Sequence, residues 1–319
     1  MKYENLVSFI GNTPLVPLKN IKSEANIFLK CEYLNPSGSI KDRMALHILK
    51  RAEEEGFLKE GMTIVENTSG NTGAAVALIS KLKGYKSIFT IPDKMSQEKI
   101  NQLKAYGAEV IVCKTEVPPE SEESYYSVAR RLAKELNAYY IDQYNNPWNI
   151  EAYYKTLGPE LWEEMDGKID IFVAGAGTGG TISGTGKFLK EKNSKIKVIG
   201  VDAVGSVFTP YFKTGKLIEP SVYKLEGIGE DYLVKCMDFS VVDDFIQVED
   251  RDGFLTARRL AREEGIYAGG SSGAALFVAL NIAKENKGKN IVVILPDHGN
   301  RYLSKFYNDD WMRENGYLS

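Results

Sequence analysis

The chain has 319 residues, of which 43% are hydrophobic and 26% charged, and its formal net charge is −3. This is the composition of a globular protein with a sizeable core, and the slightly acidic balance excludes a basic surface for nucleic acid or anionic membranes. No apolar run reaches the roughly 20 residues that span a bilayer, and the amino terminus carries no secretion signal. We therefore expect a cytoplasmic protein.

Metal-ligating residues are too sparse for a metal centre. The three cysteines, Cys31, Cys113 and Cys236, are scattered, and His47 and His298 are the only histidines. No spacing matches a zinc site, and the odd cysteine count favours a reducing compartment over a disulfide framework. We expect no metal.

Short apolar runs alternate with helical patterns along most of the chain. Strands are expected at residues 26–34, 63–66, 87–92, 109–113, 138–142, 169–174, 196–202 and 290–295. Helices are expected at residues 43–55, 72–83, 97–106, 122–136, 179–190 and 252–264. Several strands are rich in Ile and Val without alternation, which is typical of strands buried on both faces of a parallel sheet. The pattern predicts an α/β fold with two sheet domains and boundaries near residues 40 and 146.

A turn-rich stretch at residues 35–43 delivers Lys41 to the start of an expected helix. A lysine beside a helix N-terminus and away from water tends to lose its charge, and a neutral amine can form a Schiff base. The alternative for this stretch alone is a surface lysine in the first helical turn.

Two Gly- and Thr-rich stretches each join a strand to a helix. Residues 66–73 offer backbone N–H groups and hydroxyls for a carboxylate or phosphate, with simple capping by Asn71 or Thr72 as the alternative. Residues 175–181 allow close backbone approach to a phosphate.

Two further patterns suggest other enzyme classes. Gly175, Gly177 and Gly180 match a dinucleotide fingerprint, with Asp202 as the acidic partner, which indicates an NAD-dependent dehydrogenase as a remote alternative. Residues 269–273 match the GxSxG elbow of serine hydrolases, but His298 is the only histidine downstream of it.

The segments NPSGSIKDR, TSGNTG, GTGGT, GIG and GGSSG occur in this order. With them the chain resembles cysteine synthase and the catalytic core of cystathionine β-synthase, fold-type-II pyridoxal-phosphate enzymes, over residues 11–312. The resemblance implies two three-layer α/β domains with mostly parallel sheets, similar to the tryptophan synthase β subunit, with the cofactor in the cleft between them. Residues 1–40 and 146–319 would form the larger cofactor-binding domain, and residues 41–145 the smaller substrate-loop domain.

The resemblance also implies roles for individual residues. Lys41 would bind pyridoxal phosphate as a Schiff base and serve as the base at Cα. Asn71 would hydrogen-bond the 3′-oxygen of the cofactor, and Ser271 would face its pyridine nitrogen. The residues that would hold the cofactor phosphate are Gly177, Thr178, Gly179, Gly180 and Thr181. Those that would line the substrate side are Thr68, Ser69, Asn71, Thr72, Gln143 and Gly227.

The implied activity is β-replacement through an aminoacrylate intermediate, with O-acetylserine, serine or cysteine as donor and sulfide, cysteine or homocysteine as nucleophile. The alternative is an enzyme that consumes cysteine, releases sulfide and makes lanthionine or pyruvate. The Gly227-Ile228-Gly229 turn followed by an acid at Asp231 resembles cystathionine β-synthase more than simple cysteine synthases, and a second acid, Glu230, precedes Asp231. These two acids would bind a second amino acid or activate a nucleophile, unless they are solvated loop charges. The resemblance further implies a homodimer and leaves open whether a serine acetyltransferase binds.

Overall fold

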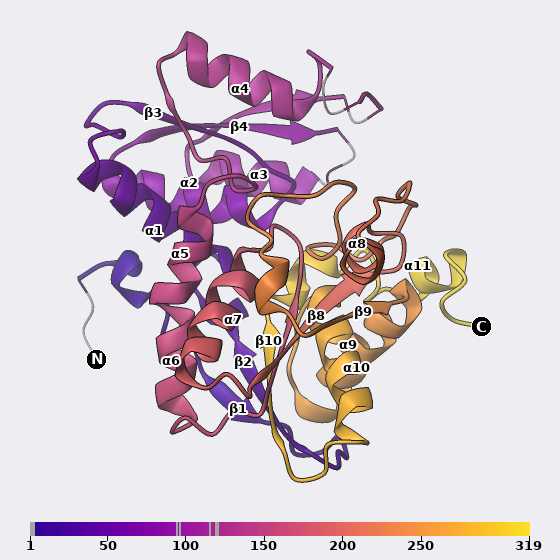
Figure 1. Cartoon of the computed structure of the whole chain (residues 1–319). Coiled ribbons are helices and arrows are strands. Elements are labelled where there is room, and N and C mark those ends of the chain that lie inside the picture. Colours follow the sequence, from indigo (N-terminus) through magenta and orange to yellow (C-terminus); the bar gives the residue numbers. More distant parts are fainter. Residues whose placement is uncertain (1–3, 94, 96, 115, 119–120) are drawn as a thin grey trace. The chain divides into compact units, whose positions relative to one another are not determined.

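The computed structural model describes residues 4–93, 95, 97–114, 116–118 and 121–319 (Figure 1). Internal contacts divide the chain into two compact units. The first unit comprises Met1–Ile10 and Asn35–Asn149, and the second comprises Gly11–Leu34 and Ile150–Ser319. The functional domains drawn from the sequence, with bounds at residues 40 and 146, stay a prediction.

The first unit is built on a four-stranded parallel sheet with the order β5-β4-β3-β6. Its strands are β3 (Thr63–Asn67), β4 (Lys86–Pro92), β5 (Glu109–Cys113) and β6 (Tyr139–Tyr140). Its helices are α1 (Lys41–Glu54), α2 (Asn71–Lys83), α3 (Gln97–Ala105) and α4 (Tyr125–Glu135). Figure 1 shows α4 on one side of this sheet and the other three helices on the opposite side.

The strand order of this sheet reverses at β3. The chain runs outward from β3 through β4 to β5, and then returns to the other side of β3 as β6. Ligands of open α/β sheets bind outside the carboxyl ends of strands at such a switch point. The segments that leave this switch point are residues 68–70 after β3 and residues 141–147 after β6.

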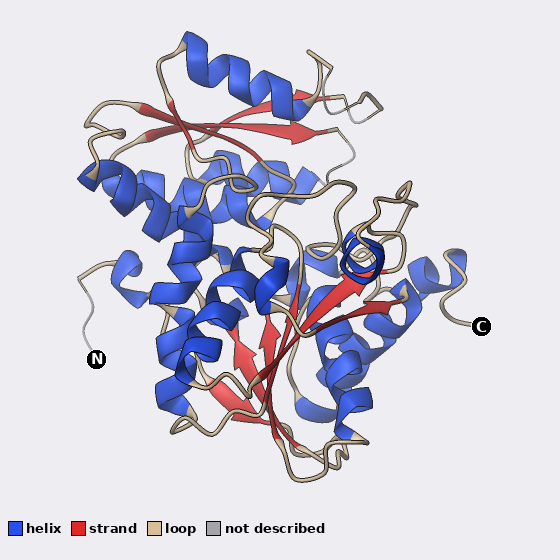
Figure 2. Cartoon of the chain, viewed as in Figure 1, coloured by secondary structure: helices blue, strands red, loops and turns tan. Residues whose placement is uncertain are grey.

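The second unit has a six-stranded sheet with the order β1-β2-β10-β7-β8-β9, in which only the β1–β2 pair is antiparallel. The strands are β1 (Leu15–Pro17), β2 (Asn26–Cys31), β7 (Ile171–Gly175), β8 (Lys197–Ala203), β9 (Asp244–Val248) and β10 (Asn290–Leu295). Its helices are α6 (Leu157–Glu164), α7 (Gly180–Lys192), α8 (Phe208–Thr214), α9 (Asp250–Glu264), α10 (Gly270–Ala283) and α11 (Asp309–Glu314). Figure 2 shows helices on both sides of its strands, and helix α5 (Trp148–Lys155) contains the boundary with the first unit.

This sheet also reverses, between β7 and β10. From β7 the strands continue through β8 to β9, whereas β10 pairs with the other side of β7. The Gly-rich segment after β7 therefore leaves the sheet at the switch point. The core lies around the same strands: from Ile291 to Leu295 no residue of β10 is more than 1% exposed, which explains an apolar run without alternation.

The α/β class with mostly parallel sheets is confirmed, but several elements differ from the sequence prediction. Helices α5, α6, α8, α10 and α11 lie outside the helical ranges predicted above. Residues 32–34, predicted as the end of a strand, form the 3₁₀ helix Glu32–Leu34. β1 and β9 were not predicted, because neither has a long apolar run. None of the described helices is long and apolar enough to cross a membrane.

All three cysteines are free thiols inside the fold. Cys31, Cys113 and Cys236 are buried, and none takes part in a disulfide. Desolvation by burial raises the pKa of the Cys31 and Cys113 thiols.

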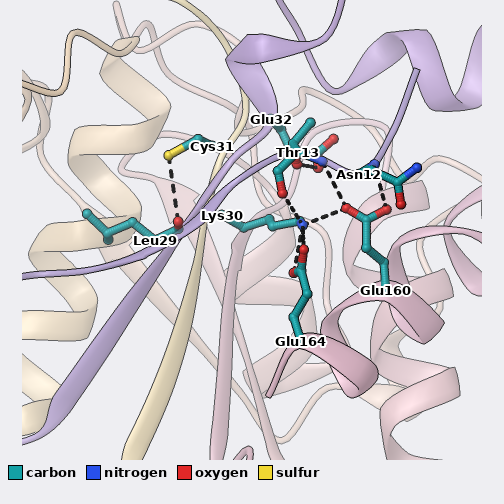
Figure 3. A network of polar contacts seen from close by, with 8 residues as sticks. All are labelled: Asn12, Thr13, Leu29, Lys30, Cys31, Glu32, Glu160 and Glu164. Atoms are coloured by element: carbon teal, nitrogen blue, oxygen red, sulfur yellow. Dashed lines mark hydrogen bonds and ion pairs between the residues drawn. The ribbon is translucent and has the colours of Figure 1, made fainter. Parts of the chain in front are cut away.

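A buried lysine ties β2 to helix α6 in the second unit (Figure 3). Lys30 is 0% exposed, and its Nζ contacts Glu160 at 2.5 Å and Glu164 at 2.7 Å. The same Nζ donates to the Thr13 carbonyl at 2.5 Å, and Glu160 accepts the N–H groups of Asn12 and Thr13. The charge of Lys30 is thus compensated by two carboxylates, and one of them, Glu160, also holds the segment before β1.

We predict that Lys30→Met lowers the free energy of unfolding by about 3–5 kcal/mol, because two carboxylates lose their buried cation. Lys289→Met is the control: Lys289 pairs with Asp170 at the surface, and its loss should cost less than about 1 kcal/mol. Urea denaturation measures both. Equal small losses would show that the buried network contributes no more than a surface pair.

Candidate functional site

Two loops at the switch points carry most of the predicted site residues. We call residues 68–72 the substrate loop and residues 175–181 the phosphate loop, after their predicted roles. The substrate loop, Lys41 and Gln143 belong to the first unit. The phosphate loop, Gly227 and Ser271 belong to the second unit.

Lys41 is the first residue of α1, and the loop before it is fixed by the next residue. The Asp42 carboxylate is 0% exposed and accepts the Ser37 N–H at 2.7 Å as well as the Ser37 hydroxyl. Gly38 adopts a φ of +88° and closes a turn onto the Asn35 carbonyl. The motif therefore places its lysine at a helix start through contacts inside the motif.

The substrate loop leads into a helix whose N-cap residue has no side chain to cap it. Helix α2 begins at Asn71, and Gly70 occupies the N-cap position, so the alternative of capping by Asn71 or Thr72 is wrong. The Thr68 Oγ1 accepts the N–H groups of Gly70 at 3.1 Å and Gly73 at 2.9 Å. The N–H groups of a first helical turn have no partner within the helix and favour an anion.

Thr72 and Gln143 lie 71 residues apart in sequence and meet in the first unit. The Thr72 hydroxyl donates to Gln143 Oε1 at 2.5 Å, and the two residues are only 3% and 4% exposed. Asn149 Nδ2 donates to the Gln143 carbonyl at 2.7 Å. Since Gln143 Oε1 accepts from Thr72, its Nε2 is the end of the amide that donates to other groups. Ser69, by contrast, is exposed.

Sequence reasoning missed a cation at the substrate loop. Lys99, in α3, donates from Nζ to the Ser69 carbonyl at 3.0 Å. Its positive charge adds to that of the α2 N-terminus and favours an anionic ligand there. The sequence of α3 alternates charged and apolar residues as any surface helix does, so nothing in it marked Lys99.

The phosphate loop requires glycine at two positions in the second unit. A Cβ atom built on Gly177 would lie 2.7 Å from the Gly227 carbonyl oxygen. Gly179 has a φ of +84°, and its Cβ would lie 2.6 Å from the Cys236 carbonyl oxygen. Gly179 is also the N-cap of α7, which has no side-chain cap. The loop thus presents uncapped N–H groups with close backbone neighbours.

Gly227 and Ser271 come together beside the phosphate loop. The Gly229 N–H donates to the Ala176 carbonyl at 2.7 Å, which fixes the Gly227–Gly229 turn. A Cβ atom on Gly227 would lie 3.9 Å from Ser271 Oγ. Ser271 is 2% exposed in the first turn of α10. The neighbouring Ser272 Oγ is buried without a hydrogen-bond partner.

Glu230 and Asp231 follow this turn. The Glu230 N–H donates to Ser206 Oγ at 3.0 Å, and its carbonyl accepts the Val207 N–H at 3.0 Å. Asp231 is exposed, and Glu230 is half-buried. The backbone before the turn is fixed as well, because the Asp250 carboxylate accepts the N–H groups of Lys224 and Leu225.

Asp202 of the dinucleotide pattern and His298 of the serine hydrolase pattern both make hydrogen bonds within the protein. Asp202 is 0% exposed, and its Oδ2 accepts the N–H and hydroxyl of Thr209 at 2.9 and 2.8 Å. Burial raises the pKa of Asp202. A carboxylate held this way is not presented to a nucleotide ribose, so the dinucleotide interpretation loses its acidic partner. His298 Nδ1 accepts the Asn300 N–H at 3.1 Å.

The loops of the two units suit different ligands: the second unit suits a phosphorylated cofactor, and the first unit suits an amino-acid substrate. The phosphate loop joins glycine-dependent close approach to an uncapped helix start, which suits a phosphate. Ser271 Oγ supplies a hydroxyl for a ring nitrogen, and the substrate loop suits a carboxylate. Among the described residues there is no cluster of His, Cys, Asp and Glu that could hold a metal ion.

Comparison with known proteins agrees with this donor set. Residues 6–297 match the family model described as "Pyridoxal-phosphate dependent enzyme". The chain is 46% identical to a cystathionine beta-synthase of Apis mellifera over 98% of this chain, and 43% identical to a cysteine synthase of Staphylococcus aureus over 94% of it. A hydrogen sulfide-producing enzyme from Fusobacterium nucleatum superposes with a TM-score of 0.87 at 36% identity, over 94% of this chain and 98% of that one.

The relatives differ in how much of their own length is matched. The chain spans 63% of the Apis mellifera cystathionine beta-synthase and 96% of the Staphylococcus aureus cysteine synthase.

We predict that Gly179→Ala weakens retention of pyridoxal phosphate by about tenfold or more. The new Cβ would collide with backbone at Cys236 and would force an L-residue into the left-handed region. The measurement is bound cofactor per chain after desalting, read from visible absorbance. Gly215→Ala is the matched control, because Gly215 has a φ of +69° but open space around its Cβ. Equal retention by the two variants would contradict the predicted role of the loop.

Proposed function

Because this chain belongs to the family of pyridoxal-phosphate dependent enzymes, and pyridoxal phosphate is its cofactor, we propose that it catalyses β-replacement on a three-carbon amino acid. The observation that carries the proposal is the Thr72–Gln143 pair beside the uncapped start of α2. This arrangement suits the α-carboxylate of an amino acid. The names of the curated relatives, cystathionine beta-synthase and cysteine synthase, support the same reaction class.

In this proposal Lys41 binds the cofactor covalently through its Nζ, and the phosphate loop binds the cofactor phosphate. Ser271 Oγ hydrogen-bonds the ring nitrogen, and Asn71 the 3′-oxygen. A hydroxyl is a weaker partner for a ring nitrogen than a carboxylate would be, because it does not hold a full positive charge on the ring. Such a partner favours prompt loss of the β-substituent over other reactions of the same substrate.

The remaining residues of the proposal bind the amino acid and move its protons. The N–H groups of the substrate loop and the Gln143 amide orient the α-carboxylate. Pyridoxal phosphate, when bound, accepts the electron pair left on Cα after proton removal. The amino group of the substrate would first displace Lys41 Nζ from the cofactor, which frees the lysine amine. The freed Lys41 Nζ would take the Cα proton, the β-substituent would leave with its bonding electrons, and a thiol or sulfide would add to the β-carbon. Lys41 then returns the proton to Cα.

The donor is O-acetylserine, serine or cysteine, and the nucleophile is sulfide, cysteine or homocysteine. A second candidate is cysteine consumption with sulfide release, giving lanthionine or pyruvate. The structural likeness to a hydrogen sulfide-producing enzyme supports it. We further propose that the protein acts as a homodimer in the cytoplasm. Co-purification tests whether a serine acetyltransferase binds to it.

The first test is the visible spectrum of the purified protein. We expect an absorbance band from bound cofactor that shifts on addition of one donor among O-acetylserine, serine and cysteine. In Lys41→Ala, turnover should fall by at least about 10³-fold, because both the covalent link and the Cα base are lost. A wild-type protein that stays colourless with added pyridoxal phosphate would refute the proposed function.

Glu230 and Asp231 provide the test of the second substrate. Glu230→Gln with Asp231→Asn should lower kcat/KM for the preferred nucleophile by about tenfold while leaving the donor-induced spectral shift in place. Steady-state kinetics with sulfide, cysteine and homocysteine give the comparison. Unchanged values with every nucleophile would assign both residues to the solvated surface.

A further inference from the structure

Besides Asp42, the first unit has another buried carboxylate, Glu66, which has no role in the reaction described above. Glu66 is on β3 and is 0% exposed. Its Oε2 accepts the Asp142 N–H at 2.9 Å, and its Oε1 accepts the Gln143 N–H at 3.4 Å. One side chain therefore bonds two consecutive backbone groups of the segment that carries Gln143.

The need for this carboxylate follows from the strand beside it. β6 has only two residues, and its ladder with β3 ends where the Ile141 N–H meets the Val65 carbonyl at 3.2 Å. At Asp142 the backbone takes a φ of +52°, a left-handed conformation that turns the chain out of the ladder. The next N–H groups have no strand partner, and Glu66 accepts them instead.

The charge of Glu66 is unfavourable for stability. Burial raises its pKa well above the ordinary value of 4.5, and the nearby Asp142 charge raises it further, while the two backbone bonds lower it. Burial also raises the pKa of the neighbouring Tyr139 to about 12, with the Glu66 charge adding to this effect. An acid with a raised folded-state pKa contributes less stability as pH rises above its unfolded value. The Glu66 carboxylate therefore holds the backbone in place although its ionisation lowers the free energy of unfolding.

Gln143 is held at three points as a result. Glu66 fixes its N–H, Asn149 fixes its carbonyl, and Thr72 fixes its side-chain oxygen. Only the first of these attachments comes from the strand that also leads into the substrate loop. A displacement of the Gln143 backbone would therefore separate its amide from Thr72.

We propose that Glu66 is a positioning residue: by accepting the Asp142 and Gln143 N–H groups it holds the Gln143 amide on Thr72 and so sets the affinity of the substrate loop for an amino-acid carboxylate. The effect of Glu66 on carboxylate affinity rests on the proposed function. Its hold on the Asp142 and Gln143 backbone rests on the hydrogen bonds alone.

The test is a double-mutant cycle of Glu66→Gln with Gln143→Ala. Glutamine keeps the shape but turns one acceptor oxygen into an NH₂ group that opposes a backbone N–H. In holoenzyme we expect Glu66→Gln to raise the dissociation constant of the donor, from the spectral titration, by about tenfold with kcat changed less than about twofold. In the Gln143→Ala background the same change should add less than about twofold.

Glu53→Gln is the matched control. Glu53 also accepts from two side chains of the first unit, Lys83 Nζ at 2.7 Å and Tyr85 Oη at 2.9 Å. Its effect should add independently to that of Gln143→Ala. Additive effects of Glu66→Gln in the same cycle would overturn the proposal. If Glu66→Gln does not fold, Glu66→Asp repeats the cycle with the charge kept and the reach shortened.

Amide hydrogen exchange separates this inference from the proposed function, because it needs no turnover. Glu66→Gln should speed exchange at Asp142 and Gln143 by about tenfold or more, and Glu53→Gln should not. Unchanged exchange at both amides would refute the positioning role even in an active enzyme. A different outcome is faster exchange in Glu66→Gln together with a wild-type protein that binds no amino acid. It would refute the proposed function and the effect of Glu66 on carboxylate affinity, while the role of Glu66 in holding the Asp142 and Gln143 backbone stands.

Discussion

Carboxylates that accept backbone N–H groups hold the loops of this protein in place. A chain that leaves a parallel sheet loses its ladder partners, and its buried N–H groups then need other acceptors. Asp42 supplies one to Ser37, before Lys41. Glu66 does so for Gln143, and Asp250 for the segment before Gly227. The segments that carry Lys41, Gln143 and Gly227 thus each depend on an acidic side chain whose partner is the main chain.

The same loops present positive potential without charged groups of their own. Helices α2 and α7 both begin after a glycine, which offers no side-chain cap. Thr68 Oγ1 accepts the Gly73 N–H in α2, and the other first-turn N–H groups have no partner within their helix. Both start at the carboxyl edge of a sheet whose strand order reverses. Strand order and glycine N-caps together favour anion binding by backbone groups, and the Lys99 charge near the start of α2 favours it further.

The sequence predicted where the loops lie between strands and helices, but not the long-range contacts that hold them. Lys41, Thr72 and the Gly-rich segment stand in contiguous sequence motifs between a strand and a helix. Such motifs can be recognised without knowledge of the three-dimensional structure. Gln143 was placed only by resemblance, since its partner Thr72 is 71 residues away. Glu66 was recognised as part of a motif, but its partners at Asp142 and Gln143 depend on the pairing of β3 with a two-residue strand. No periodicity encodes such a pairing.

The buried thiols have a consequence for the protein's own integrity. A catalyst proposed to handle sulfide and thiol substrates works among nucleophiles that also exchange with disulfides. Cys31, Cys113 and Cys236 are all sequestered in the fold, and burial keeps the first two in the less reactive protonated form. The fold therefore shields all three thiols from reagents in solution, and alkylating reagents become reporters of unfolding.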